Sequence, residues 1–547
     1  MSRRMVSTCV LTLVMFAAVT ASAQSFKVQC PASTITHPVT KTQDNNSEPV
    51  YTGATALTLG ANGYLVPSGN ANGAIKCQQI SGGDGYSTMA DGTQTYMFSF
   101  GPLSGLADIA AGKPGTEFPN VFNVVSPTTL SPGDPATTAN KSGAFGWNGA
   151  VGLTPDLDAL GDGKCTSPCL DGHVDPRPIM DIGVMNGNIP APMMAIDEDD
   201  EFFLTLTNVG MIMRPDLFEQ HTVHFHGYPN ASSFYDGVPD ASVAINIGGS
   251  FTYYYLAPDA GTYFWHCHIT PPEHLQMGMV GQLYVRPRQN RVPSGTTLYS
   301  ALQAQQADLR TACPGSTSGT GVLPVDPVCT NQLPAVITTA TGGTTVSTDA
   351  SGATKSGYAY DDGDGSTYYD VEYPLQIHGF DPNFHFVGMT FNPEGFADMK
   401  DKYFLLNGRS YPDTIHDGPM QTVSADGASH FSQPLSAIIN IPAGKKALLR
   451  ISDLDVSEYQ TLASLGIPMT VIGYNAKLLR DQDGNNMYYK TNSITLGGGE
   501  SLDVILDASD TTKYKANQVF YLYTPNLDHL SNDAENFGGL MTEIHIN

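Results

Sequence analysis

Short runs in which apolar and polar residues alternate, separated by turn residues, dominate this chain. Residues 202–208 (Phe-Phe-Leu-Thr-Leu-Thr-Asn) are one example, and a period of two is typical of a half-buried β-strand. The aromatic-rich run 261–268 and the apolar run 280–285 predict two more strands. With 56 glycines and 37 prolines for turns, the pattern predicts an all-β protein made of Greek-key β-sandwiches.

An internal repeat indicates that two domains share this fold. Residues 245–251 (Ile-Asn-Ile-Gly-Gly-Ser-Phe) are echoed by residues 494–501, and residues 185–187 by residues 406–408. A chain of 547 residues is long enough for two such domains. The expected division is a signal peptide (1–23), a loop-rich N-terminal extension with opening strands (24–175), a first domain (176–290), a linker (291–370) and a second domain (371–547).

Candidate metal ligands are concentrated in the first domain. Six of the 14 histidines and one cysteine lie within residues 221–274. If the segments that carry them are strands, successive side chains point to opposite faces. Cys267 then faces away from its two histidine neighbours, and the ligands divide into two groups joined by the Cys267 backbone. The groups are His221, Cys267, His274 and Met279, and separately His224, His226, His266 and His268.

The residue types in the first group select the metal. One thiolate, two imidazoles and one long thioether form the ligand set of a blue-copper electron-transfer site. A structural zinc site would more often show a second cysteine. The sequence therefore predicts copper, with Met277 as an alternative to Met279 for the thioether.

These segments resemble the multicopper oxidases, a family that includes laccases, ascorbate oxidase, ceruloplasmin and, more distantly, copper nitrite reductase. The matching stretches are residues 186–190, 221–227, 236–239, 261–268, His274 and 278–279. The resemblance implies two cupredoxin-like domains and a type 1 copper on His221, Cys267, His274 and Met279. It implies His224 as a type 2 ligand, and His226, His266 and His268 as type 3 ligands. Asp236 resembles an acid that feeds protons to that cluster, although a turn-forming Asp before glycine is the alternative.

Two departures from the family pattern affect the expected site. The spacer 269–273 is longer than usual, and a complete trinuclear cluster needs eight histidines where this chain shows four. Superposing the repeats places Ile467, Thr470 and Ile472 on the positions of His221, His224 and His226, and residues 524–526 on those of residues 266–268. The second domain thus lacks these ligands. His529 is predicted either to complete a copper site in a neighbouring chain or to be an ordinary loop histidine.

Targeting, charge and cysteines indicate an exported protein. Arg3, Arg4, the apolar run 10–19 and the small residues 21–23 are typical of a secretory signal, so a periplasmic or extracellular location is expected, with no membrane span. The net charge of −26 argues against nucleic acid as a partner and favours metal ions or a basic cytochrome. Disulfides are predicted between Cys30 and Cys77, Cys165 and Cys169, and Cys313 and Cys329. The acidic run 361–365 predicts a turn, with a calcium loop as the alternative.

Three functions remain open at this point. The first is an oxidase that takes electrons from a small-molecule, metal-ion or cytochrome reductant at the type 1 copper and passes them to O₂, two copies of the first domain supplying four histidines each in a homo-oligomer. The second is a type 1 electron-transfer protein with an incomplete second site. The third is a nitrite-reductase-like enzyme that uses His529.

Overall fold

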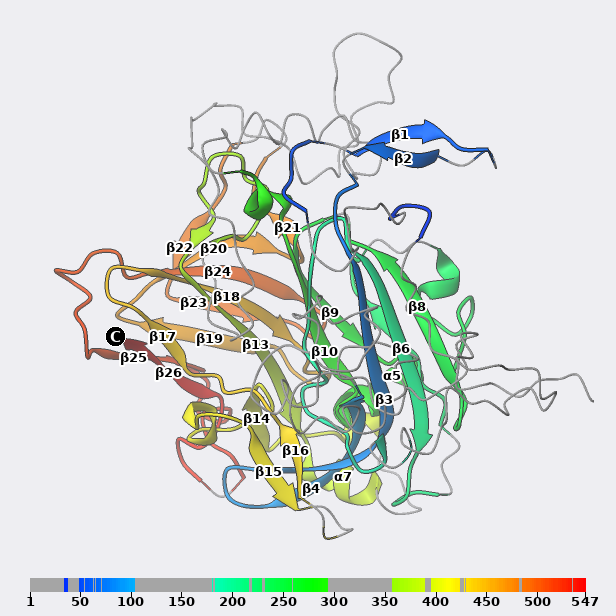
Figure 1. The fold of residues 1–547 in the computed structure, drawn as a ribbon. Helices are drawn as coiled ribbons and strands as arrows, with labels where there is room; N and C mark the ends of the chain where they lie inside the picture. The colour runs from blue at the N-terminus through cyan, green and yellow to red at the C-terminus, as the bar shows by residue number, and fades with distance from the viewer. Residues whose placement is uncertain are drawn as a thin grey trace, which may run out of the picture.

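Two β-sandwiches make up most of the regular structure, as the alternating pattern predicts. The computed structural model describes residues 34–37, 49–103, 180, 183–293, 357–388 and 395–547, apart from gaps of one to three residues within these ranges. In Figure 1 the blue and green strands of the first sandwich lie beside the yellow to red strands of the second. No helix among these residues is both long and apolar enough to cross a membrane.

The first sandwich has two four-stranded sheets, ordered β4-β3-β6-β8 and β5-β10-β9-β7. The strands predicted at 202–208, 261–268 and 280–285 are confirmed as β6, β9 and β10. Apolar side chains such as Ile80, Leu204, Trp265 and Leu283 are buried between the sheets. The strand bounds are β3 (Ile75–Thr88), β4 (Gln94–Pro102), β5 (Met194–Asp197), β6 (Glu201–Gly210), β7 (His224–Phe225), β8 (Ser250–Leu256), β9 (Gly261–His266) and β10 (Val280–Arg286).

The second sandwich has the sheets β14-β13-β18-β24-β20-β21, with β22 on β20, and β17-β26-β25-β19-β23. A second apolar core, which includes Ile377, Leu449 and Val504, fills the space between them. The strand bounds are β13 (Val371–Phe380), β14 (Tyr403–Leu406), β17 (Ile439–Ile441), β18 (Lys446–Asp453), β19 (Gln460–Leu465), β20 (Met469–Tyr474), β21 (Lys477–Leu478), β22 (Tyr489–Thr491), β23 (Ser493–Leu496), β24 (Ser501–Asp507), β25 (Val519–Tyr523) and β26 (Met541–Ile546).

Small elements complete the described structure. The acidic run 361–365 forms a turn in which Asp362 accepts the backbone N–H groups of Asp364 and Gly365. The remaining bounds are β1 (Ala56–Leu59), β2 (Leu65–Gly69), β11 (Gly357–Tyr358), β12 (Tyr368–Tyr369), β15 (Met420–Val423), β16 (Ser429–Gln433), α5 (Pro271–Gln276), α7 (Pro382–Gly388), and the 3₁₀ turns η3 (Ser233–Tyr235), η4 (Arg288–Arg291), η5 (Phe396–Asp398) and η6 (Asp413–Ile415).

The pairing pattern confirms the repeat and corrects the superposition made from the sequence. β9 lies between β10 and β7 as β25 lies between β26 and β19. His266 pairs with Val280 and His224, while Tyr523 pairs with Met541 and Ala463. The counterparts of His221, His224 and His226 are therefore Gln460, Ala463 and Leu465 on β19, and not Ile467, Thr470 and Ile472. The counterparts of residues 266–268 are residues 523–525, one position earlier than predicted.

Strand β9, which leads into Cys267, packs directly on the second sandwich. Thr262 Oγ1 donates a hydrogen bond to Asp503 at 2.6 Å, and Ser501 Oγ donates one to the Thr262 carbonyl at 2.6 Å. A Cβ atom on Gly261 would lie 2.6 Å from the Ala476 backbone, so only glycine fits this close approach. The second domain therefore supports the strand that carries the candidate ligands.

Several predictions fall outside the described residues. They are the signal peptide, most of the linker, and at least one cysteine of each expected disulfide: Cys30, Cys165, Cys169, Cys313 and Cys329. Cys77 is described and lies buried on β3. The three pairings and the domain boundaries stay predictions.

Candidate metal centre

The first predicted ligand group comes together in the core of the first sandwich. His274 Nδ1 lies 3.3 Å and His221 Nδ1 4.0 Å from the sulfur of Cys267. These three donor atoms lie within 4.8 Å of one another, and all three residues are fully buried. Cys267 is a free thiol, and its sulfur accepts the backbone N–H of Thr222 at 3.4 Å. Two ring nitrogens and one sulfur thus converge on one point, away from water.

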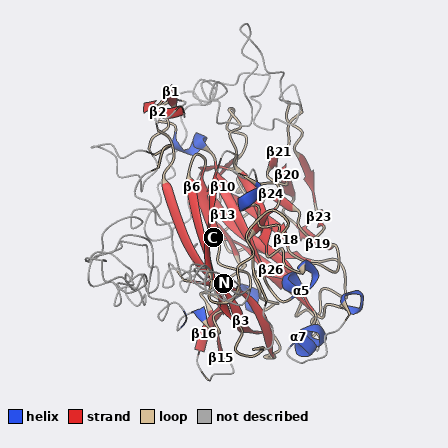
Figure 2. Cartoon of the chain, turned by 90° about the vertical axis from the view of Figure 1, so that its right-hand side faces the viewer, coloured by secondary structure: helices blue, strands red, loops and turns tan. Residues whose placement is uncertain are grey.

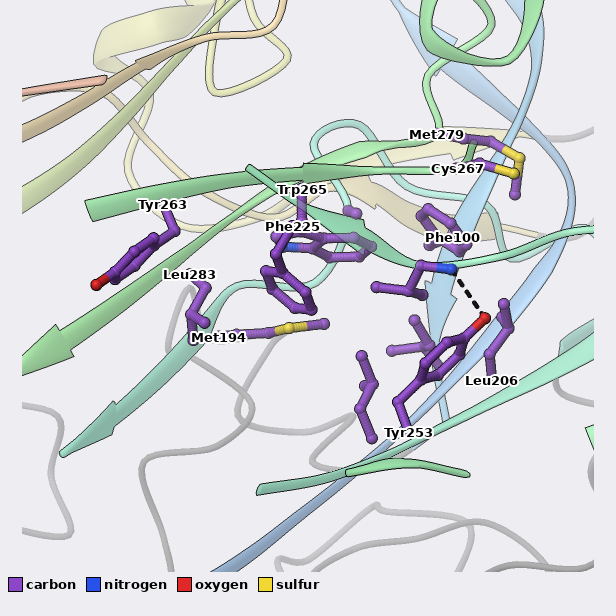
Figure 3. Close-up of a cluster of buried hydrophobic side chains, with 14 of the residues drawn as sticks. Phe100, Met194, Leu206, Phe225, Tyr253, Tyr263, Trp265, Cys267, Met279 and Leu283 are labelled. Atoms are coloured by element: carbon purple, nitrogen blue, oxygen red, sulfur yellow. Dashed lines mark hydrogen bonds between the residues drawn. The ribbon is translucent and has the colours of Figure 1, made fainter. Parts of the chain in front are cut away.

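Met279 reaches the same place from the start of β10. Figure 3 shows the sulfur atoms of Met279 and Cys267 pointing toward each other. The backbone ties them as well, because the Cys267 N–H donates to the Met279 carbonyl at 3.1 Å. A Cβ atom on Gly82 would lie 2.7 Å from the His221 ring and 3.4 Å from the Met279 methyl group, so glycine leaves room for both side chains. This arrangement supports Met279 as the thioether ligand, while Met277 ends helix α5.

Electrostatics favour the thiolate form that binds metals. Burial alone would raise the pKa of the Cys267 thiol, but His274 and His221 outweigh it and bring that pKa well below its usual range. Burial lowers the pKa of His274, but Cys267 and Glu219 together outweigh burial and raise that pKa to about 9. A thiolate beside imidazole nitrogens is the donor set expected for copper, so this group fits the predicted cofactor.

The second ligand group lies on the opposite face of the same strand. The structure brings together His224, His226 and His266. The Nδ1 of His224 donates to the Asp236 carbonyl at 2.7 Å, and the Nδ1 of His266 donates to the Cys267 carbonyl at 2.7 Å. Because a carbonyl oxygen only accepts, each Nδ1 carries the proton and each Nε2 keeps a lone pair. Backbone carbonyls therefore set both rings for metal binding through Nε2.

The second domain orients the third ring of this group. His226 is hydrogen-bonded to the backbone of Gly499, and a Cβ atom there would lie 2.7 Å from His226 Nδ1. The Nε2 atoms of His226 and His266 face each other at 3.0 Å. Burial lowers the pKa of His226 to about 4 and that of His266 well below the usual range. Both rings therefore favour the neutral form that binds metals, and their Nε2 atoms converge on one place, so the group fits a metal.

His268 and Asp236 are placed at the edge of the second group. The His268 ring packs against those of His266 and His224 at centroid distances of 5.4 and 5.1 Å, but it is not part of the close group of three. Asp236 Oδ2 lies 3.5 Å from His224 Nδ1. Asp236 thus contributes its backbone to the orientation of His224, a role that the sequence did not indicate.

The second domain keeps the backbone outline of the first ligand group but only one of its four ligand types, a histidine. The Thr524 N–H donates to the Leu540 carbonyl at 3.0 Å, and the Leu540 N–H donates to the His529 carbonyl at 2.9 Å. In the first domain the Cys267 N–H donates to the Met279 carbonyl at 3.1 Å, and the Met279 N–H donates to the His274 carbonyl at 2.8 Å. His529 is therefore the counterpart of His274. Its Nδ1 lies 2.9 Å from Oε1 of Gln460, the counterpart of His221.

This placement corrects the prediction that His529 completes a copper site in a neighbouring chain. His529 is buried, and its Nε2 also pairs with Glu458 at 2.7 Å. Its ring stacks on Phe404 with the centroids 4.1 Å apart. Both ring nitrogens are engaged within the chain, and reaching another subunit would break both interactions.

Helix α5 and the cavity beside it were not predicted. The spacer between His268 and His274 forms the helix, and the sequence carried a signal for it in Pro271 at its start and Glu273 in its first turn. A cavity of about 500 Å³ lies between this helix and the second domain. It is lined by His226, Phe264, Pro271, Pro272, Leu275, Asp455, Val456, Ser457, Glu458, Tyr459, Gly497, Gly498, Gly499 and Glu500. A small molecule in it would contact the second ligand group and the residue after His274.

Two sandwiches with a buried thiolate–imidazole–thioether group define a cupredoxin-type copper protein. Comparison with known proteins narrows this class. Residues 172–290 match the family Multicopper oxidase. This segment is therefore similar to the domains of the multicopper oxidases, as the resemblance implied, and copper is the cofactor of that family.

Individual sequence relatives each match about a fifth of the chain. Laccase abr2 of Aspergillus fumigatus is 32% identical over 128 residues, which cover 23% of this chain and 20% of that protein. Multicopper oxidase MmcO of Mycobacterium tuberculosis is 31% identical over 131 residues (22% and 24%). A copper-containing nitrite reductase of Neorhizobium galegae is 34% identical over 106 residues (19% and 25%). The blue copper oxidase of Nitrosomonas europaea superposes with a TM-score of 0.45 and 16% identity over 86% of both chains. The chain thus matches a fifth to a quarter of the sequence relatives' lengths.

Proposed function

We propose that this chain is an exported copper oxidoreductase that takes electrons from a reductant at the first ligand group and delivers them to O₂ at the second. Copper, when bound, would supply the one-electron transfer. His221, Cys267, His274 and Met279 would hold the type 1 copper. His224, His226, His266 and His268 would hold copper at the second group.

The observation that carries this proposal is the direct connection between the two groups. The Cys267 side chain belongs to the first group, and its carbonyl accepts the Nδ1–H of His266, a member of the second, at 2.7 Å. His266 is also its neighbour along the backbone. A few covalent bonds and one hydrogen bond therefore join the groups. Burial excludes water from the first group, while His224 and His226 at the second are only partly buried.

The chain offers groups for the substrates of this reaction. O₂ reduction to water consumes protons, and the Asp236 carboxylate lies beside His224, where it can hold one. The cavity between the domains has space for a small reductant. Glu458 and Glu500 at its wall suit a metal ion or another cationic reductant, and the net charge of −26 attracts cations or a basic cytochrome.

The second ligand group has half of the histidines of a trinuclear site. The second domain has Ala463 and Leu465 at the positions of His224 and His226, so the missing histidines would come from a second copy of the chain. Copper per chain, oligomeric mass and O₂ uptake test this together. We expect more than one copper per chain, an oligomer and O₂ consumption. One copper per chain, a monomer and no O₂ uptake would refute the proposal.

The incomplete half-site favours a second candidate, a type 1 electron-transfer protein. This function needs only the first ligand group, and the second domain would then serve as its support. A blue protein that exchanges electrons with a cytochrome but does not reduce O₂ would identify it. The nitrite-reductase-like alternative needs His529 as a copper ligand. It is not supported, because His529 contacts Gln460 and Glu458 within the chain.

A further inference from the structure

Helix α5, which carries the proposed type 1 ligand His274 and is followed by Met279, is held in place by the second domain. His378 Nε2 on β13 donates to the Leu275 carbonyl at 2.9 Å. His385 Nε2 on α7 lies 2.9 Å from the Gln276 carbonyl. Figure 2 shows α5 and α7 at the same end of the molecule. Both contacts fall on the two residues that follow His274.

The side chain of Gln276 adds two more contacts with the second domain. Its Nε2 donates to Asp401 Oδ1 at 3.0 Å, and its Oε1 accepts the backbone N–H of Asp381 at 2.9 Å. Gln276, His378, His385, Asp381 and Asp401 are all buried. Buried polar groups are costly to leave without partners, so this set allows only one position for the end of α5.

The helix could not hold this position by itself. It has six residues and follows Thr270, whose φ of 37° lies in the left-handed region. Isolated helices of this length are unstable in water. The position of α5 matters for both ligands, because the His274 Nδ1 faces the Cys267 sulfur at 3.3 Å and the His274 carbonyl accepts the Met279 N–H at 2.8 Å.

We propose that Gln276, His378 and His385 are positioning residues for the type 1 centre, through which the second domain fixes the loop that carries His274 and Met279. This inference rests on the proposed copper at the first ligand group. It gives the second domain, which lacks copper ligands of its own, a defined part in the centre of the first. Outer partners of metal ligands commonly change metal affinity roughly 10- to 100-fold when they are removed.

A matched control lies on β10. Gln282 is as buried as Gln276, and its side chain likewise makes two hydrogen bonds with the second domain: Nε2 donates to the Arg450 carbonyl at 3.0 Å and to Ser452 Oγ at 2.7 Å. It contacts no residue of the ligand loop through these bonds. Gln276→Leu and Gln282→Leu therefore remove comparable contacts between the domains. Only Gln276→Leu removes contacts made by a residue of α5.

The experiment compares copper-loaded full-length wild type, Gln276→Leu, His378→Phe and Gln282→Leu. The readouts are the blue absorption band, the copper hyperfine splitting in EPR, the midpoint potential, and copper affinity by chelator competition. We expect Gln276→Leu and His378→Phe to weaken copper binding roughly tenfold and to shift the EPR signal and potential. Gln282→Leu should keep wild-type values. Wild-type copper affinity, spectrum and potential in both Gln276→Leu and His378→Phe would overturn the inference.

A measurement on the unmodified protein covers the case in which the variants do not fold. Because the coupling between copper and the second domain is reciprocal, copper should slow hydrogen exchange in residues 378–385. Unchanged exchange there on copper binding would also refute the inference. A wild-type protein that binds no copper would refute the proposed function itself, which distinguishes the two failures.

Discussion

Gly499 in the second domain should determine whether the second ligand group binds copper. It precedes β24 with a φ of +91°, and a Cβ atom on it would lie 2.7 Å from Nδ1 and 2.8 Å from Cε1 of His226. Ordinary contact begins at 3.4 Å. In Gly499→Ala the imidazole would therefore have to retreat by about 0.7 Å, well beyond the tolerance of roughly 0.2 Å for a metal–ligand distance.

The control for this variant is Gly248, the counterpart of Gly499 in the first domain. Its φ is +77°, and a Cβ atom there would meet nothing within 4 Å. Both substitutions place a side chain on left-handed backbone, at a cost of roughly 1–2 kcal/mol. Both variants should therefore lose similar thermal stability, while only Gly499→Ala displaces a ligand.

Copper per chain after dialysis against graded chelator, measured with the blue absorption band, separates the two effects. In Gly499→Ala the second-group copper should bind roughly 10- to 100-fold more weakly, while the blue band is retained. Gly248→Ala should keep all of its copper. The reasoning would be refuted if Gly499→Ala retained second-group copper as tightly as Gly248→Ala does.

Three further predictions concern the thiolate, a buried acid and a buried ion pair. Cys267→Ser should abolish the blue band but leave the copper of the second group, as absorption and metal analysis would show; a persisting band would contradict this. Burial, with the nearby Asp455 carboxylate, raises the pKa of Asp401 well above 3.8, so the folded state holds a proton that the unfolded state releases above about pH 4. The unfolding free energy should fall as pH rises from there through the folded-state pKa, and Asp401→Asn should flatten that slope in urea titrations at several pH values; an unchanged slope would exclude the explanation. Arg450 is fully buried 3.0 Å from Glu372, so Arg450→Met should cost about 3–5 kcal/mol of unfolding free energy in urea; a loss below about 1 kcal/mol would show that the pair is dispensable.

The division between the two ligand groups was predictable from the sequence because Cys267 and its histidine neighbours lie at the end of a regular strand, β9. With a period of two, Cys267 must face away from His266 and His268, and the structure shows Cys267 beside His274 and His266 beside His226. Local geometry therefore fixed the division into two groups before any tertiary contact was known. His274, by contrast, lies on helix α5 and His221 lies outside the named strands.

Contacts between the domains could not be read from the sequence. His226 meets Gly499 and Gln276 meets Asp401 across more than 100 residues of chain, and no local pattern encodes such pairs. The superposition of the repeats was wrong for a related reason. Loops between equivalent strands differ in length because surface connections tolerate insertion and deletion. One offset therefore cannot align His224 with Ala463 and also Ser250 with Ser501.

The hydrogen bond between Gln460 and His529 has a consequence for how the protein matures. It joins two residues of the second domain whose counterparts in the first domain, His221 and His274, would both bind the ion. The second half of the chain can thus finish folding in the absence of any metal supply. An arriving ion would then meet a second domain that is already folded against the strand and loop that bind it.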